Sequence, residues 1–160
     1  QGAMLIGAHL GNFDILRLVT REARIPVNVL MYLENAQRIN DAFKSLDPDS
    51  IVRIIHVDPD SPGIGFEVRE CIKRGEFVAV LSDRVGANRR KRMSRFQFLG
   101  REAYFPQGPF LLASLMQVPV ILTVALKRGS RQYEIFMEEI SDDEDDGSGT
   151  KDYLGYNIYD

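Results

Sequence analysis

Several residue types that mark common protein classes are scarce in this sequence. The chain of 160 residues has a single cysteine, so it cannot form an internal disulfide, and its two histidines with that cysteine do not make a zinc-binding set. No apolar run reaches the roughly 18 residues that a membrane-crossing helix needs. The longest run, Val118–Leu126, fits a buried strand. We therefore expect no metal and no transmembrane segment.

Two more absences narrow the function. The net charge is −3, so no overall positive charge favours nucleic-acid binding. No G-x-S-x-G motif is present, which argues against an ordinary serine hydrolase. Gly63-Ile64-Gly65 is similar to a dinucleotide-binding loop, but Val68 stands where the third glycine is needed, so a nucleotide-binding α/β protein is a disfavoured rival.

What the sequence does contain is an alternation of strand-like and helix-like segments. Strands are expected at Ala3–Ala8, Val27–Tyr32, Ile51–Val57, Phe77–Ser82, Arg95–Leu99, Val118–Leu126 and Tyr133–Met137. Helices are expected at Gly11–Arg24, Asn35–Leu46, Phe66–Lys73 and Pro106–Met116. This order predicts one α/β domain with a mostly parallel central sheet flanked by helices, in which Tyr133–Met137 is an edge strand.

The composition changes near residue 140. Asp142–Asp146 is acidic throughout and Gly147–Thr150 is similar to a flexible linker, so we expect residues 1–140 to form the folded core and 141–160 an acidic, flexible tail. The sequence opens almost directly on the expected strand Ala3–Ala8. We expect the natural domain to start further upstream, where any membrane anchor would lie.

A histidine and an aspartate flank the first expected strand–helix junction. His9 directly follows the strand. It therefore lies at the carboxyl end of a strand, which is where ligands bind in open α/β sheets. Asn12 can cap the next helix, and Asp14, in its first turns, can hold one imidazole nitrogen protonated while the other accepts a proton. The spacing alone fits equally well a histidine at a helix start beside a solvated aspartate.

Two other segments carry candidate binding groups. The basic residues Arg84, Arg89, Arg90, Lys91, Arg92 and Arg95 fall close together in an acidic chain. They suit the phosphates of a lipid head group or a phosphopantetheine arm, an acidic carrier protein, an anionic membrane, or simply a solvated loop. Phe105–Pro109 predicts a turn into a helix, where the amides around Gly108 would hold an oxyanion or phosphate, or merely start a helix.

These segments together are similar to a known family. His9-Leu10-Gly11-Asn12-Phe13-Asp14 resembles the H-x-x-x-x-D/E signature of the glycerolipid and lysophospholipid acyltransferase superfamily. The blocks that follow it in the family have counterparts here in the same order: Asp83-Arg84, Phe98-Leu99-Gly100-Arg101, Phe105-Pro106-Gln107-Gly108-Pro109 and Val118-Pro119-Val120-Ile121. The resemblance runs from about Gly2 to Glu138 and is strongest to the bacterial branch that acylates lipid A precursors, including acyltransferases associated with aryl polyene lipids.

Two departures bear on the expected substrate. Gln107 stands where the wider superfamily has a glutamate, and Pro109 where it has a threonine. Carboxylate chemistry is therefore absent at position 107. Both changes weaken the transfer of glycerophosphate-binding roles and fit the lipid A branch better.

The resemblance implies a glycerol-3-phosphate acyltransferase-like fold and an O-acyltransferase acting on lipids. It implies a general base at His9, assisted by Asp14, and transfer without an acyl-enzyme. Substrate binding falls to Asn12, Arg84, Phe105, Gln107 and Gly108, and docking of the donor or its phosphates to Arg89, Arg90, Lys91 and Arg92. The donor would be an acyl carrier protein or coenzyme A thioester, with no cofactor or metal. The acceptor would be a lipid A precursor or related glycolipid, met at the cytoplasmic face of the bacterial inner membrane.

Two rivals stay open beside this hypothesis. In a thioesterase, water would replace the lipid hydroxyl as acceptor. In a non-catalytic module, the same surface would bind a lipid or a carrier protein without turnover.

Overall fold

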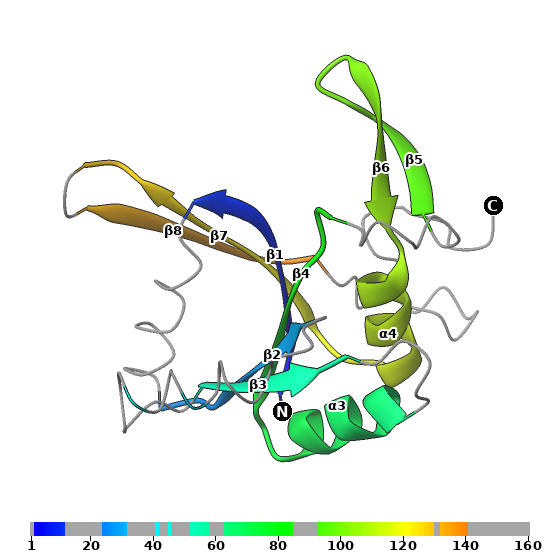
Figure 1. The fold of residues 1–160 in the computed structure, drawn as a ribbon, viewed down its shortest axis with the longest axis vertical. Coiled ribbons are helices and arrows are strands. Elements are labelled where there is room, and N and C mark those ends of the chain that lie inside the picture. The colour runs from blue at the N-terminus through cyan, green and yellow to red at the C-terminus, as the bar shows by residue number, and fades with distance from the viewer. Residues whose placement is uncertain are drawn as a thin grey trace.

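The computed structural model describes residues 2–11, 24–31, 41, 45, 52–57, 63–84, 93–129 and 132–140. Within these ranges the chain forms a large central sheet, two helices and a separate two-stranded hairpin (Figure 1). The predicted α/β class is confirmed.

The central sheet has six strands in the order β3-β2-β4-β1-β7-β8. They are β1 (Met4–Gly11), β2 (Val27–Met31), β3 (Val52–His56), β4 (Phe77–Leu81), β7 (Val120–Lys127) and β8 (Tyr133–Glu139). Every neighbouring pair is parallel except β7 and β8, which are antiparallel. The prediction of a mostly parallel sheet with the last strand at its edge is therefore confirmed.

Apolar side chains bury the sheet on both of its faces. The helices α3 (Gly63–Lys73) and α4 (Gly108–Met116) lie on one face, as Figure 1 shows. There Met4 and Ile6 of β1 join a core cluster with Val68 of α3 and Ala113 of α4. Because successive strand residues point to opposite faces, the intervening Leu5 belongs to a second cluster with Val27, Val29 and Ala79. Burial on both faces is typical of parallel sheets.

A polar network around the buried side chains of Glu76 and Asn28 joins the amino ends of β2 and β4. Arg74 follows α3 and donates from Nε and Nη2 to the two carboxylate oxygens of Glu76, at 2.7 and 2.9 Å. Asn28, only 1% exposed, donates to the same carboxylate at 2.8 Å and to the carbonyl oxygen of Phe77 at 3.2 Å. The bonds from Arg74 lower the pKa of Glu76 to about 2 against the effect of burial, and Asn28 acts in the same direction.

The sequence predicted only one of the two strands of the hairpin. The sequence indicated one short strand at Arg95–Leu99, whereas the structure has β5 (Met93–Phe98) paired antiparallel with β6 (Arg101–Pro106). Leu99 and Gly100 form the turn, both at positive φ (50° and 77°). A leucine is an unusual residue there, because such two-residue turns favour Asn-Gly, and this hid the second strand. The hairpin stands beyond the end of the central sheet (Figure 1).

Other expected boundaries shift or lie outside the described residues. The helix expected from Gly11 cannot start there, because Gly11 is the last residue of β1; most of its remaining span, like the tail 141–160, is not described. Of the helix expected at Asn35–Leu46, only residues 41 and 45 are described, and both are helical. The helix expected from Phe66 begins at Gly63, and the one expected from Pro106 begins at Gly108. No helix within the described ranges is long and apolar enough to cross a membrane.

Candidate functional site at the carboxyl ends of β1 and β4

The strands β1 and β4 are neighbours whose connections run in opposite directions. From β1 the chain passes to β2 on one side of this pair, and from β4 it passes to β7 on the other side. In open α/β sheets such a reversal opens space at the carboxyl ends of the two strands, and ligands bind there. The topology therefore directs attention to the residues that end β1 and β4.

His9 and Asp83 meet at this position. The last aligned pair of β1 and β4 is Gly7 with Leu81, and two residues further along each chain segment lie His9, in β1, and Asp83, just after β4. Their side chains are in contact, with Nδ1 of His9 2.7 Å from Oδ1 of Asp83. The pair lies 74 residues apart in the chain and is created entirely by the adjacency of β1 and β4.

The backbone around His9 departs from a regular ladder. β1 pairs with β7 up to Gly7 and Thr123, then resumes at Gly11 and Ala125 with a shifted register. His9 therefore lies inside the irregular end of the strand, not directly after it as the sequence suggested. Such irregularities often re-aim a side chain next to a functional site. The side chain of His9 is 40% exposed, so it is accessible to a ligand.

The Asp83 carboxyl is held in its ionised form. Partial burial by itself raises its pKa, but hydrogen bonds from the His9 side chain and from the backbone of His9 and Asp83 outweigh burial, and the pKa is lowered overall. A carboxylate that accepts from Nδ1 requires that nitrogen to carry the proton. Nε2 of a neutral His9 is then left with its lone pair, which is the state that a general base needs.

The expected partner of His9, Asp14, lies outside the described residues, as does Asn12. Its role stays a prediction. Because Asp83 already occupies Nδ1, a second carboxylate would have to approach Nε2, the nitrogen that would accept a proton. The geometry thus favours Asp83 as the residue that orients His9.

Arg84 lies next to this pair and is largely exposed. Its side chain is 69% exposed, and its Nε is 3.8 Å from Oδ2 of Asp83, a loose ion pair. At this exposure the pair contributes little to stability. The other predicted docking residues, Arg89, Arg90, Lys91 and Arg92, lie outside the described residues.

The predicted binding residues Phe105, Gln107 and Gly108 lie where the hairpin passes into α4. Phe105, in β6, packs its ring against Phe96 and Phe98, at centroid distances of 6.2 and 5.6 Å. Gln107 precedes α4, but its side chain does not cap the helix; its amide donates to Ser94 Oγ at 2.7 Å. Gly108, at the first position of α4, is exposed and has open space where a side chain would be. Gln107 therefore serves to join hairpin and helix, while Gly108 keeps the helix start accessible.

Other polar groups in the core are less suited to chemistry. Burial raises the pKa of the Cys71 thiol, and the residue lies within the core cluster, so it is no candidate nucleophile. The hydroxyl of Ser82, next to Asp83, is buried without a hydrogen-bond partner among the described residues. Among the residues that the structure describes, no group of three or more metal-ligating side chains occurs.

Sequence reasoning missed the Asp83 contact for a definite reason. Asp83 stood out beside Arg84 as the end of a strand, but nothing in the sequence showed that the fourth parallel strand returns to lie against the first. Comparison with known proteins adds no further guide, since no family model and no curated protein matches the chain.

Proposed function

We propose that the chain is an O-acyltransferase that moves a fatty acyl group from a thioester to a hydroxyl of a lipid. The observation that carries this proposal is the His9–Asp83 pair at the reversal point of the sheet, with the imidazole exposed and Nδ1 engaged. The ordered blocks of the resemblance supply the reaction class. A glycerol-3-phosphate acyltransferase-like fold is part of the same proposal.

In this mechanism Nε2 of His9 takes the proton of the acceptor hydroxyl as its oxygen attacks the thioester carbonyl carbon. Asp83 stabilises the imidazolium that forms, because its carboxylate faces Nδ1. The tetrahedral intermediate collapses with cleavage of the carbon–sulfur bond. The proton on Nε2 passes to the departing thiolate, which leaves as a free thiol, and His9 returns to its starting state. No covalent acyl-enzyme forms.

Arg84 and the start of α4 would bind the two substrates. Arg84, exposed beside Asp83, is placed to meet a phosphate of the donor or acceptor. The open start of α4 at Gly108 offers backbone amides to the developing oxyanion or to a phosphate. The donor would be an acyl carrier protein or coenzyme A thioester and the acceptor a lipid A precursor or related glycolipid, met at the cytoplasmic face of the bacterial inner membrane.

A thioesterase is the second candidate, since a histidine that is 40% exposed can activate water as readily as a lipid hydroxyl. Both reactions consume thioester, so the product decides between them. Acylated lipid indicates the transferase, and free fatty acid in the presence of acceptor indicates the hydrolase.

The test compares wild type with His9→Ala in a thioester-consumption assay with lipid acceptor. We expect the variant to lose at least about a hundredfold in rate, the usual contribution of a general base. His9 is exposed, so the variant should unfold at nearly the same temperature as wild type. Equal rates would remove His9 from the mechanism, and a wild type that binds the thioester without turnover would indicate a non-catalytic binding module.

A further inference from the structure

The tip of the β5–β6 hairpin combines two features that oppose stability. Leu99 has φ of 50°, a left-handed conformation that a leucine side chain disfavours, and it is 89% exposed. Phe98, the residue before it, is 54% exposed. Asparagine at position 99 would suit the turn and the solvent better. Leu99 thus opposes stability both by its exposure and by its backbone conformation, and residues that do so often serve in binding.

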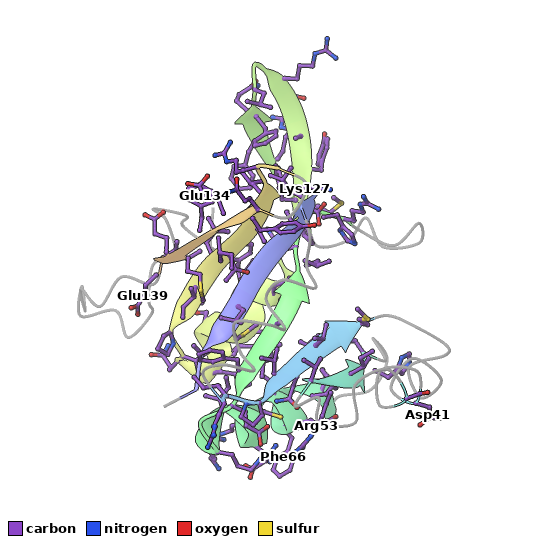
Figure 2. All side chains as sticks on the ribbon, turned by 90° about the vertical axis from the view of Figure 1, so that its left-hand side faces the viewer. Asp41, Arg53, Phe66, Lys127, Glu134 and Glu139 are labelled. Carbon is purple, nitrogen blue, oxygen red and sulfur yellow. The ribbon has the colours of Figure 1, made fainter. Side chains whose placement is uncertain are left out.

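The tip projects away from the body at the functional end of the sheet. In Figure 1 the hairpin stands past the carboxyl end of β4. Along the long axis of the molecule, which is vertical in Figure 2, Arg53, near the start of β3, lies far from the hairpin, and Lys127, which closes β7, lies at a level closer to it. A flat surface that met Leu99 would therefore approach the molecule from the side on which His9 and Asp83 lie.

The charge of the hairpin indicates which kind of surface its tip would bind. Residues 93–106 contain Arg95 and Arg101 against one carboxylate, Glu102, a net charge of +1 in a chain whose net charge is −3. Arg95 contacts Glu102 at 3.2 Å, and Arg101, aligned with Phe98 across the hairpin, is exposed. An apolar tip bordered by arginine matches a bilayer that has an anionic surface above an apolar interior.

We propose that the β5–β6 hairpin is a membrane-docking element, in which Leu99 and Phe98 enter the acyl region of an anionic bilayer and Arg101 lies among its phosphates. Docking in this way would bring the carboxyl ends of β1 and β4 toward the membrane surface. The inference does not depend on the chemistry of His9.

The variant Leu99→Asn separates binding from folding. Asn-Gly is the preferred pair for this turn, so we expect the variant to unfold at the same temperature as wild type or a higher one. The matched control is Leu115→Gln, which removes a leucine that is 77% exposed on α4, away from the hairpin. His9→Ala serves as a second control, because it should abolish turnover and leave docking unchanged.

The measurement is co-sedimentation with vesicles of phosphatidylcholine and phosphatidylglycerol, and with vesicles of phosphatidylcholine alone. We expect wild type to bind the anionic vesicles, Leu99→Asn to bind about tenfold more weakly, and Leu115→Gln to bind like wild type. Salt should weaken wild-type binding.

Three results would overturn the proposal: no binding by wild type, binding by Leu99→Asn equal to wild type, or equal losses in Leu99→Asn and Leu115→Gln. If the second result came together with loss of acyl carrier protein binding in Leu99→Asn, the tip would be a protein contact. Failure of the acyltransferase proposal would appear separately, as equal turnover in wild type and His9→Ala.

Discussion

The two ends of the central sheet each carry an ionic contact, and the contacts differ in kind. At the amino ends, Glu76 is buried and accepts bonds from Arg74 and Asn28. At the carboxyl ends, Asp83 holds an imidazole that remains 40% exposed, with Nε2 bonded to no described residue. The carboxylate of the first contact is buried and bonded within the fold, whereas the second contact leaves one imidazole nitrogen for a ligand. We therefore assign a stabilising role to the contact before β4 and the proposed chemistry to the contact after it.

The largest expected effect is on turnover and comes from the carboxyl end. Asp83→Asn keeps the shape of the side chain but removes the charge that fixes the Nδ1–H form of His9. We expect thioester turnover to fall by about a hundredfold or more, while the free energy of unfolding changes by less than about 1 kcal/mol because the pair is partly exposed. Steady-state kinetics and urea unfolding measure both. Turnover within threefold of wild type would separate Asp83 from the reaction.

The amino end should show the opposite response. Glu76→Gln replaces the buried carboxylate, weakens its bonds to Arg74, and should lower the free energy of unfolding by about 2 kcal/mol. Turnover per folded molecule should not change. The control Glu102→Gln breaks an exposed ion pair with Arg95 and should cost about 0.5 kcal/mol or less. Similar losses in the two variants would refute the distinction between the ends.

The pH dependence of stability gives a finer test of the same carboxylate. The pKa of Glu76 falls from an ordinary 4.5 to about 2 on folding, so its contribution is complete above pH 4.5 and disappears as the pH falls toward 2. The difference in unfolding free energy between wild type and Glu76→Gln should be constant from pH 6 to 8 and shrink below about pH 4.5. Urea unfolding across this range measures it. A difference that persists unchanged at pH 2.5 would contradict the assigned ionisation.

The smallest expected effect concerns Ser82, which lies next to Asp83. Its hydroxyl is buried without a partner among the described residues, so Ser82→Ala removes an unsatisfied group. We expect the free energy of unfolding to change by less than about 0.5 kcal/mol or to rise. Asn28→Ala, which removes a buried amide with two bonds, should instead cost more than about 1 kcal/mol. A large loss in Ser82→Ala would mean that its hydroxyl is bonded in solution.

The sequence was informative where local patterns determine structure. Apolar runs such as Met4–Ile6 and Val78–Val80 are core strands because they are buried on both faces, and Gly75 ends α3 through its positive φ of 78°. The second strand of the hairpin was missed, since its turn uses leucine where asparagine is usual. The order of the strands in the sheet could not be predicted either, because local sequence patterns do not determine it.

The site was predictable only in part, because it too depends on the order of the strands. His9 and Arg84 could be selected because each lies near the end of an apolar strand. The contact of His9 with Asp83 could not be predicted, because it depends on β1 and β4 being neighbours, and their adjacency is set by packing across the whole sheet. A carboxylate five positions along the chain was the only partner that spacing could suggest.

The most direct test of the central claim is the tautomer of His9, read from long-range ¹H–¹⁵N NMR correlations of its imidazole. We predict that wild-type His9, when neutral, carries its proton on Nδ1, that Asp14→Asn keeps this form, and that Asp83→Asn loses it. A proton on Nε2 in wild type, or a tautomer that changes with Asp14→Asn and not with Asp83→Asn, would contradict the account.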